Sequence, residues 1–208
     1  MVTPESGIAQ PRGRLQVMLL GLIFLAPVIG ATLLFFSGWR PVGQVNHGEL
    51  IEPARAWPAV PLRGADGTSI ASEPWADHWN LVYVVADDCD AACEGALDLM
   101  QRLQASQGKE AGRVARALAL LREPRRNLTA LVSRFPGTAV WIPGSSASPA
   151  WDAYFAGHDA NGDRVAGDGS IRFVDPRGYY MMRFPAGSDP NGVRRDLARL
   201  LKLSKGKQ

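Results

Sequence analysis

The chain has 208 residues, of which 46% are hydrophobic and 21% are charged, with 23 Lys and Arg against 20 Asp and Glu. This composition excludes a disordered or collagen-like chain, and the net charge of +3 is too small to make a polyanion binder the first expectation. The two cysteines exclude a multi-disulfide secreted scaffold and a four-thiolate zinc site. The length indicates one domain and an additional segment.

The first element is a long apolar segment, which predicts a transmembrane helix over residues 15–38. No charged residue occurs between Leu15 and Trp39, and an apolar stretch of that length spans a bilayer. A cleaved signal peptide has a shorter apolar run that ends in small residues, whereas this run continues through Phe35 and Phe36. We therefore expect an uncleaved single-pass anchor.

The basic residues around the span predict its orientation. Arg12 and Arg14 precede it and Arg40 follows it, which is a slight bias toward a cytoplasmic N-terminus. Residues 1–14 are then a cytoplasmic tail. The predicted location is the inner membrane of a bacterium, with the C-terminal domain in the periplasm.

After the anchor, residues 39–61 are rich in proline and predict a tether with a first strand, and residues 62–208 predict the folded domain. The domain opens with a hairpin whose turn is Asp66–Gly67. A continuous apolar run from Leu81 to Val85 then predicts a buried central strand. Apolar residues at helical spacing follow the two cysteines, so a buried strand leads into a helix that begins with Cys89 and Cys93.

The rest of the chain continues to alternate between strand and helix patterns. The expected elements are an ambiguous helix or strand at 113–121, a short helix at 127–135, a strand at 138–142, a short helix at 149–156, two strands at 171–175 and 179–184, and an amphipathic helix at 192–203. This order predicts an α/β sandwich around a mixed sheet that ends in a hairpin and a C-terminal helix.

The chemistry of the domain centres on Cys89 and Cys93. Four residues apart at a helix start, they lie on one face, close enough to form a disulfide or to bind one soft metal ion. The helix N-terminus favours thiolate, whereas every charge from Gly64 to Gln101 is negative, and nearby carboxylates raise the pKa of a thiol. The negative charge suits a cation, and Cu(I) prefers thiolates. A structural disulfide or two core cysteines are the alternatives.

The segments WNLVYVVADDCDAACEGALDLM, NHGELI and SIRFVDPRGYYMMRF resemble the Sco/SenC family. Its members are thioredoxin-like, membrane-anchored assembly proteins of cytochrome c oxidase. The resemblance implies a thioredoxin-like domain, a mixed central sheet flanked by helices, and copper, Cu(I) or Cu(II), as the cofactor. It implies Cys89 and Cys93 as copper ligands and as the catalytic pair, and the copper-bearing subunit of the oxidase as the partner.

One residue departs from the family pattern. The family's third copper ligand is a histidine that follows an aspartate before the first hairpin strand, and here the aspartate is Asp168 and the next residue is Gly169. His158, in the glycine-rich segment ahead of the hairpin, is the candidate substitute. The chain is therefore interpreted as a divergent relative that lacks the usual copper-ligand histidine.

A basic stretch follows the acidic one, with eight basic and two acidic residues from Arg102 to Arg134. No aromatic platform accompanies it, so the sequence predicts no nucleic-acid partner. Three hypotheses remain. The chain is an assembly factor that delivers Cu(I) or reduces thiols at the oxidase copper site, a periplasmic thiol–disulfide oxidoreductase without copper, or a non-catalytic assembly scaffold. Whether it is an enzyme stays open.

Overall fold

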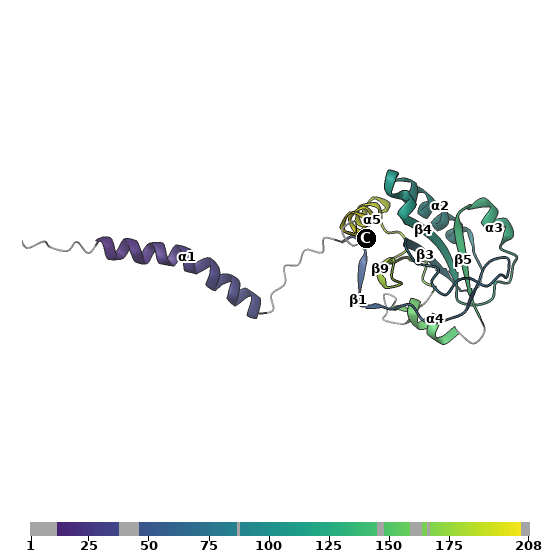
Figure 1. Cartoon of the computed structure of the whole chain (residues 1–208), viewed down its shortest axis with the longest axis horizontal. Coiled ribbons are helices and arrows are strands. Elements are labelled where there is room, and N and C mark those ends of the chain that lie inside the picture. Colours follow the sequence, from purple (N-terminus) through teal and green to yellow (C-terminus); the bar gives the residue numbers. More distant parts are fainter. Residues whose placement is uncertain are drawn as a thin grey trace, which may run out of the picture. The chain divides into compact units, whose positions relative to one another are not determined.

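The computed structural model describes residues 12–37, 46–86, 88–144, 148–158, 164–165 and 167–204. The chain divides into two compact units, Met1–Gln44 and Val45–Gln208 (Figure 1). The second unit holds the sheet and its covering helices. It takes in residues 45–61, part of the segment that the sequence assigned to the tether and first strand.

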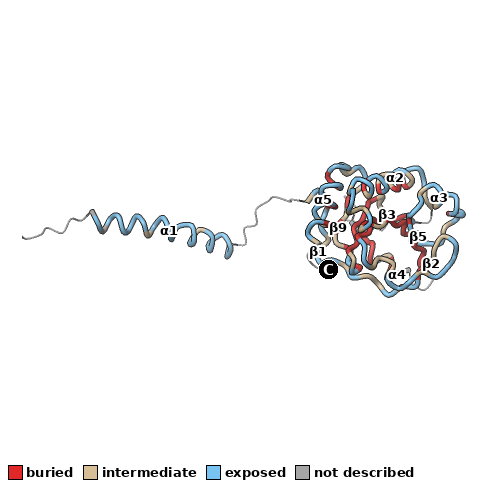
Figure 2. Tube along the Cα trace, turned by 45° about the horizontal axis from the view of Figure 1, so that its top comes forward, coloured by how far each residue is buried: buried red, intermediate tan, exposed pale blue. Residues whose placement is uncertain are grey.

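The first unit contains helix α1 (Arg12–Phe36), where the sequence predicts a span over 15–38. The section Leu15–Phe36 is long and apolar enough to cross a membrane. The tube of α1 is coloured as exposed over most of its length (Figure 2), and its large apolar residues are among the exposed ones. A helix of this length and composition is suited to a bilayer. Pro27 lies inside the helix without ending it.

A seven-stranded mixed sheet forms the centre of the second unit, in the order β1-β9-β8-β3-β4-β5-β2. Its strands are β1 (Glu49–Arg55), β2 (Leu62–Arg63), β3 (Trp79–Val85), β4 (Val114–Leu120), β5 (Thr138–Pro143), β8 (Ile171–Val174) and β9 (Tyr180–Phe184). Strands β3, β4 and β5 are parallel neighbours, whereas β8 pairs antiparallel with β3. The parallel pairs need crossover connections, and helices supply them.

The two faces of the sheet are covered differently. Helices α2 (Ala91–Ala105), α3 (Thr129–Arg134) and α5 (Pro190–Leu203) pack on one face, and α4 (Ser148–Phe155) packs on the other. Strand β3 is buried over its whole length (Figure 2) because it is the central strand of the sheet and helices cover both faces of the sheet. The predicted buried strand at Leu81–Val85 is therefore confirmed.

The ambiguous segment at 113–121 resolves into a short 3-10 helix, Gly108–Arg113, followed by strand β4. The small alternating alanines of β4 pack beside β3, in the centre of the sheet where the space for side chains is limited. The predicted hairpin also forms, since Arg63 bridges Ser69 across the Asp66–Gly67 turn. Two short strands, β6 (Gly157–His158) and β7 (Arg164–Val165), form a separate two-stranded sheet.

Candidate functional site

Helix α2 starts between the two cysteines because Asp90 caps it. The Asp90 carboxylate accepts a hydrogen bond of 2.9 Å from the backbone N–H of Cys93. An aspartate at this position satisfies a first-turn N–H that has no partner within the helix. The local sequence thus fixes Cys89 just outside the helix and Cys93 in its first turn.

Cys89 and Cys93 are joined by a disulfide, with their Cα atoms 5.2 Å apart. The two sulfurs differ in environment. Cys93 is completely buried and packs in the core with Leu97 and Met100, whereas Cys89 is partly buried and lies against the edge of the same core. An incoming thiol therefore reaches the disulfide from the Cys89 side.

The negative charge of the segment from Gly64 to Gln101, which contains both cysteines, is partly balanced by basic residues from the stretch between Arg102 and Arg134. Arg134 of α3 donates to the Glu94 carboxylate, with 2.9 Å from Nη1 to Oε2, and Arg102 pairs with Asp98 at 2.9 Å. Asp90, at the start of the helix, stays exposed. Asp87, which belongs to the predicted acidic segment, lies outside the described residues. Negative charge near the cysteines is therefore concentrated at the start of α2.

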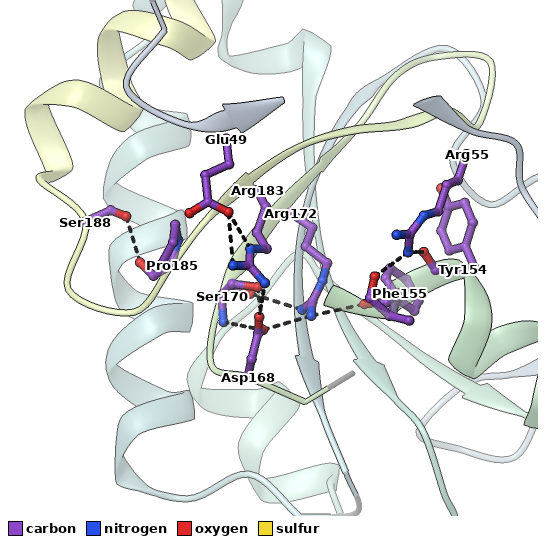
Figure 3. Close-up of polar contacts among 11 residues, drawn as sticks. Glu49, Arg55, Tyr154, Phe155, Asp168, Ser170, Arg172, Arg183, Pro185 and Ser188 are labelled. Carbon is purple, nitrogen blue, oxygen red and sulfur yellow. Dashed lines mark hydrogen bonds and ion pairs between the residues drawn. The ribbon is translucent and has the colours of Figure 1, made fainter. Parts of the chain in front are cut away.

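A second part of the site is the loop before β8, which is held by a buried ionic network (Figure 3). Asp168 pairs with Arg172 and with Arg183, each at 2.8 Å, and Arg183 extends the network to Glu49 of β1 at 3.0 Å. The Ser170 hydroxyl donates to Asp168 at 2.6 Å. Arg172 has no exposed surface, so the carboxylate of Asp168 is what balances its charge.

Gly169 follows this anchored aspartate and has a φ of +70°, in the left-handed region. A Cβ at this position would lie 3.4 Å from the Tyr83 hydroxyl and 3.6 Å from the Cβ of Ala186. A side chain on residue 169 would therefore point toward Tyr83. In this chain that position carries only hydrogen.

A cavity of about 270 Å³ lies between α2, the Gly169 loop and the loop after β9. Its α2 wall consists of small or apolar residues, and the opposite wall includes Tyr83 and Gly169. Ala92, which lines the cavity, lies between the two cysteines in the sequence. The cavity and the disulfide therefore share the first turn of α2.

Tyr83 is 5% exposed and lines this cavity. Burial raises the pKa of its hydroxyl, the carboxylates of Asp90 and Asp168 raise it further, and Arg172 partly opposes them. The phenol therefore stays protonated well above neutral pH and is a hydrogen-bond donor. Within the described parts of the chain its hydroxyl has no hydrogen-bond partner.

The described residues do not supply the ligand set that the family resemblance implies for copper. His47 pairs with Asp196 at 3.1 Å, and His78 contacts the carbonyl of Ala76. His158 is in β6, but its side chain is outside the described part of the structure. No group of three or more His, Cys, Asp or Glu residues suited to a metal occurs among the residues described. Among the described side chains, the two cysteine sulfurs are the donors at this site, and they do not by themselves make the three-ligand copper site of the family.

The sequence interpretation missed the network around Asp168. Arg172 lies in a predicted buried strand, between Ile171 and Phe173, and a charged residue in such a strand requires a partner. The position of Arg172 in the sequence therefore indicated that a partner for its charge was needed. Arg183, however, reaches Asp168 only through the pairing of β8 with β9, and Glu49 reaches Arg183 only through the pairing of β9 with β1.

The comparisons with known proteins begin with one family model, described as a transmembrane-like, thioredoxin-like, C-terminal domain, which matches residues 79–204. The chain belongs to this family. The transmembrane-like, thioredoxin-like match covers the parallel core of the sheet, both cysteines and helix α5. No curated protein matches the sequence.

Solved structures of Sco proteins share the fold at low sequence identity. Copper-bound ScoI of Bradyrhizobium japonicum is 17% identical, with a TM-score of 0.52, over 70% of this chain and 99% of its own. Copper-bound yeast Sco1 is 14% identical, with a TM-score of 0.58, over 74% and 97%. BsSco, a member of the Sco family of cytochrome c oxidase assembly proteins in which a disulfide switch was identified, is 13% identical, with a TM-score of 0.52, over 75% and 100%. The predicted thioredoxin-like fold and the resemblance to Sco proteins are thereby confirmed.

Proposed function

We propose that this protein is a membrane-anchored, Sco-like assembly factor of cytochrome c oxidase that acts by thiol–disulfide exchange through Cys89 and Cys93. The carrying observation is the asymmetric disulfide at the start of α2, with one sulfur near the surface and the other in the core. The Sco fold and the description of BsSco as an oxidase assembly protein support the assembly role.

The reduced pair exchanges in two steps. The Cys89 thiolate attacks one sulfur of a substrate disulfide, the substrate S–S bond breaks, and the second substrate sulfur leaves as a thiolate. The Cys93 thiolate then attacks Cys89, forming the Cys89–Cys93 bond and releasing the first substrate sulfur as a thiolate. Two electrons pass from the pair to the substrate disulfide, and a dithiol reductant restores the pair.

The exposure of the two sulfurs assigns these roles. The attacking sulfur must approach the substrate disulfide along the axis of the S–S bond that breaks. Cys89 is accessible enough for this approach, whereas Cys93 is buried. Cys93 remains within bonding distance of Cys89, so its attack needs no large movement. Cys89 is therefore the attacking residue and Cys93 the resolving one.

The predicted location also belongs to this proposal. The apolar helix Leu15–Phe36 anchors the chain in the inner membrane of a bacterium, with residues 1–14 in the cytoplasm and the thioredoxin-like domain in the periplasm. That compartment permits a disulfide to persist and to exchange. The proposed substrate is a cysteine pair on the copper-bearing subunit of the oxidase.

The test uses the reduced full-length chain in lipid nanodiscs and a peptide whose two cysteines form a disulfide. We expect one peptide disulfide to be reduced per chain, no reduction by Cys89→Ser, and a trapped mixed disulfide with Cys93→Ala, all followed by mass spectrometry. Absence of exchange in the wild type, while dithiothreitol readily reduces its own disulfide, would overturn the proposal. Full oxidase activity in cells that carry the Cys89→Ser/Cys93→Ser double variant would favour a scaffold instead.

Transfer of Cu(I) as a substrate is the second candidate, favoured by the two sulfurs whose Cα atoms lie 5.2 Å apart. After reduction both thiolates can bind one soft ion, and copper-bound Sco proteins share this fold. A titration of the reduced chain with Cu(I) decides it. One ion bound per chain, lost in Cys89→Ser, would support copper transfer, and the absence of stoichiometric binding would remove it.

A further inference from the structure

We propose that the cavity beside the disulfide binds the substrate polypeptide, taking a large apolar side chain that flanks the cysteine exchanging with Cys89. This inference rests on the proposed exchange function and names its substrate class. It concerns the cavity of about 270 Å³ between α2, the Gly169 loop and the loop after β9. That volume is large enough to take an aromatic or branched aliphatic side chain.

The position of the cavity carries the first part of the argument. The residues of α2 that face it follow helical spacing from the disulfide loop onward, at Ala92, Gly95, Ala96 and Leu99. A substrate cysteine bonded to Cys89 therefore continues directly along this wall. Gly95 is exposed, and a Cβ added there meets nothing within 4 Å, so the wall is open to an incoming chain.

A polar group in the opposite wall points to a ligand independently. Tyr83 is 5% exposed, and its hydroxyl borders the cavity without a hydrogen-bond partner among the described residues. The hydroxyl itself is not among the fully buried polar atoms that lack a partner, so it is open to the cavity and can donate to a ligand group that accepts the hydrogen bond in place of water. A carbonyl oxygen of a bound polypeptide is such an acceptor.

Charge complementarity restricts the occupant further. Asp90 is exposed at the start of α2, and its negative charge acts on the Tyr83 hydroxyl inside the cavity. Asp168 is balanced by two arginines, whereas Asp90 makes its described side-chain contact with a backbone N–H. The mouth of the cavity therefore favours a segment with neutral or basic residues next to the apolar one and disfavours acidic residues.

Ion pairs and hydrogen bonds hold the two loops that line the cavity opposite α2. The Asp168 network holds the Gly169 loop, and in the loop after β9 the Ser188 hydroxyl donates to the carbonyl of Pro185 at 2.7 Å (Figure 3). Both Pro185 and Ser188 line the cavity. A preformed cavity binds its occupant without paying the entropy of ordering its own walls.

The experiment compares exchange rates of two peptide disulfides, one with phenylalanine after the cysteine and one with glycine, on the reduced full-length chain in nanodiscs. We expect the phenylalanine peptide to react about tenfold faster, the effect of burying one large apolar side chain. Replacing a neighbouring lysine of that peptide by glutamate should slow it several-fold, and added salt should reduce this difference.

Two variants block the cavity and have matched controls. Gly95→Leu adds an apolar side chain to the cavity wall, and Gln101→Leu adds the same side chain at an exposed α2 position outside the cavity. Gly169→Asn fills the opposite wall, and Gly67→Asn makes the same change at another left-handed glycine, in the Asp66–Gly67 turn. Asparagine tolerates this backbone conformation better than most residues. The blocking variants should reduce the tenfold preference to less than about twofold, and the controls should keep it.

A third measurement separates this inference from the function on which it rests. Peptides with serine in place of cysteine are titrated onto the oxidised chain, and binding is followed by fluorescence anisotropy. Equal affinity of the phenylalanine and glycine peptides, or an unchanged preference in Gly95→Leu, would overturn the cavity proposal. Preferential binding without any exchange of the cysteine peptides would uphold the cavity and overturn the exchange function.

Discussion

The two faces of the central sheet differ in chemistry as well as in the helices that cover them. The face under α4 is aromatic, with Trp57, Trp141 and Trp151 in edge-to-face contact at centroid distances of 5.3 Å. The face under α2, α3 and α5 is mainly aliphatic and contains Cys93. The aromatic side chains of the α4 face pack among small and aliphatic residues, and the disulfide and the cavity lie on the other face.

Under the proposed exchange function, this difference corresponds to a division between a face that stabilises the fold and a face that carries the exchanging disulfide. Aromatic clusters bury large areas and pack with specific geometry. The α4 face therefore stabilises the sheet, and the disulfide lies on the opposite face of that sheet. The face under α2, α3 and α5 is less densely packed at the cavity, because α2 has glycine and alanine there. Changes on the aromatic face should therefore alter stability with little effect on exchange at temperatures where the variant is folded.

The largest expected effect is that of Trp151→Ala. Trp151 is fully buried, and its indole N–H donates to the carbonyl of Leu120 at 2.7 Å. The substitution should lower the free energy of unfolding by about 3–5 kcal/mol, the usual cost of removing a buried aromatic side chain. Urea denaturation measures this, and the rate of thiol exchange at low temperature should stay unchanged. A loss below about 1 kcal/mol would contradict the supporting role.

Asp168→Ala should have the next largest effect because Asp168 pairs with buried Arg172 and lies next to Gly169, which lines the cavity. It leaves Arg172, which is buried among aromatic residues, without its paired carboxylate, and such a loss costs about 3 kcal/mol. Unlike Trp151→Ala, it should also loosen the Gly169 loop and lower the peptide preference. The control is Asp152→Ala, which breaks a more exposed pair with Arg122 and should cost less than about 1 kcal/mol. Equal losses in both variants would refute this reading.

The smallest effect concerns alkaline pH and again separates the faces. Burial raises the pKa of Tyr154 on the aromatic face and of Tyr83 on the face under α2, α3 and α5 above the ordinary value of 10.0. The folded protein then holds these protons when the unfolded chain has lost them. The contribution of these two tyrosines to stability is therefore constant below about pH 10 and falls as the pH rises beyond it. Unfolding measured between pH 7 and 11 should show a smaller decline in Tyr154→Phe than in Tyr83→Phe, and the reverse order would contradict it.

Much of the fold could be predicted because its signals are local. The apolar run of β3 and the helical spacing after Cys93 specify their elements within a few residues, and the long apolar helix α1 follows from length and composition. Strand β4 was ambiguous because its alternating alanines fit a helix as well as a strand, and only the packing beside β3 decides between them. The spacing of Cys89 and Cys93 at a helix start allowed a disulfide, and the structure contains one.

The rest of the site could not be predicted because it depends on tertiary contacts. The cavity is enclosed by residues of α2, β3, the Gly169 loop and the loop after β9, which no local pattern brings together. The position of Gly169 was identified from the family resemblance, but the direction of its missing side chain toward Tyr83 follows from the backbone conformation. The partner of Arg172 likewise depends on the turn that places Asp168 beneath it.

The order of the strands has a consequence for how the protein is made. The two strands that leave the ribosome first, β1 and β2, form the opposite edges of the sheet. Strand β2 can pair only after β5 has been synthesised, and β1 can pair only after β9, which is close to the C-terminus. Strand β1 therefore stays without its partner strand while the parallel centre of the sheet forms. The sheet is complete at both edges only when nearly the whole chain has been synthesised.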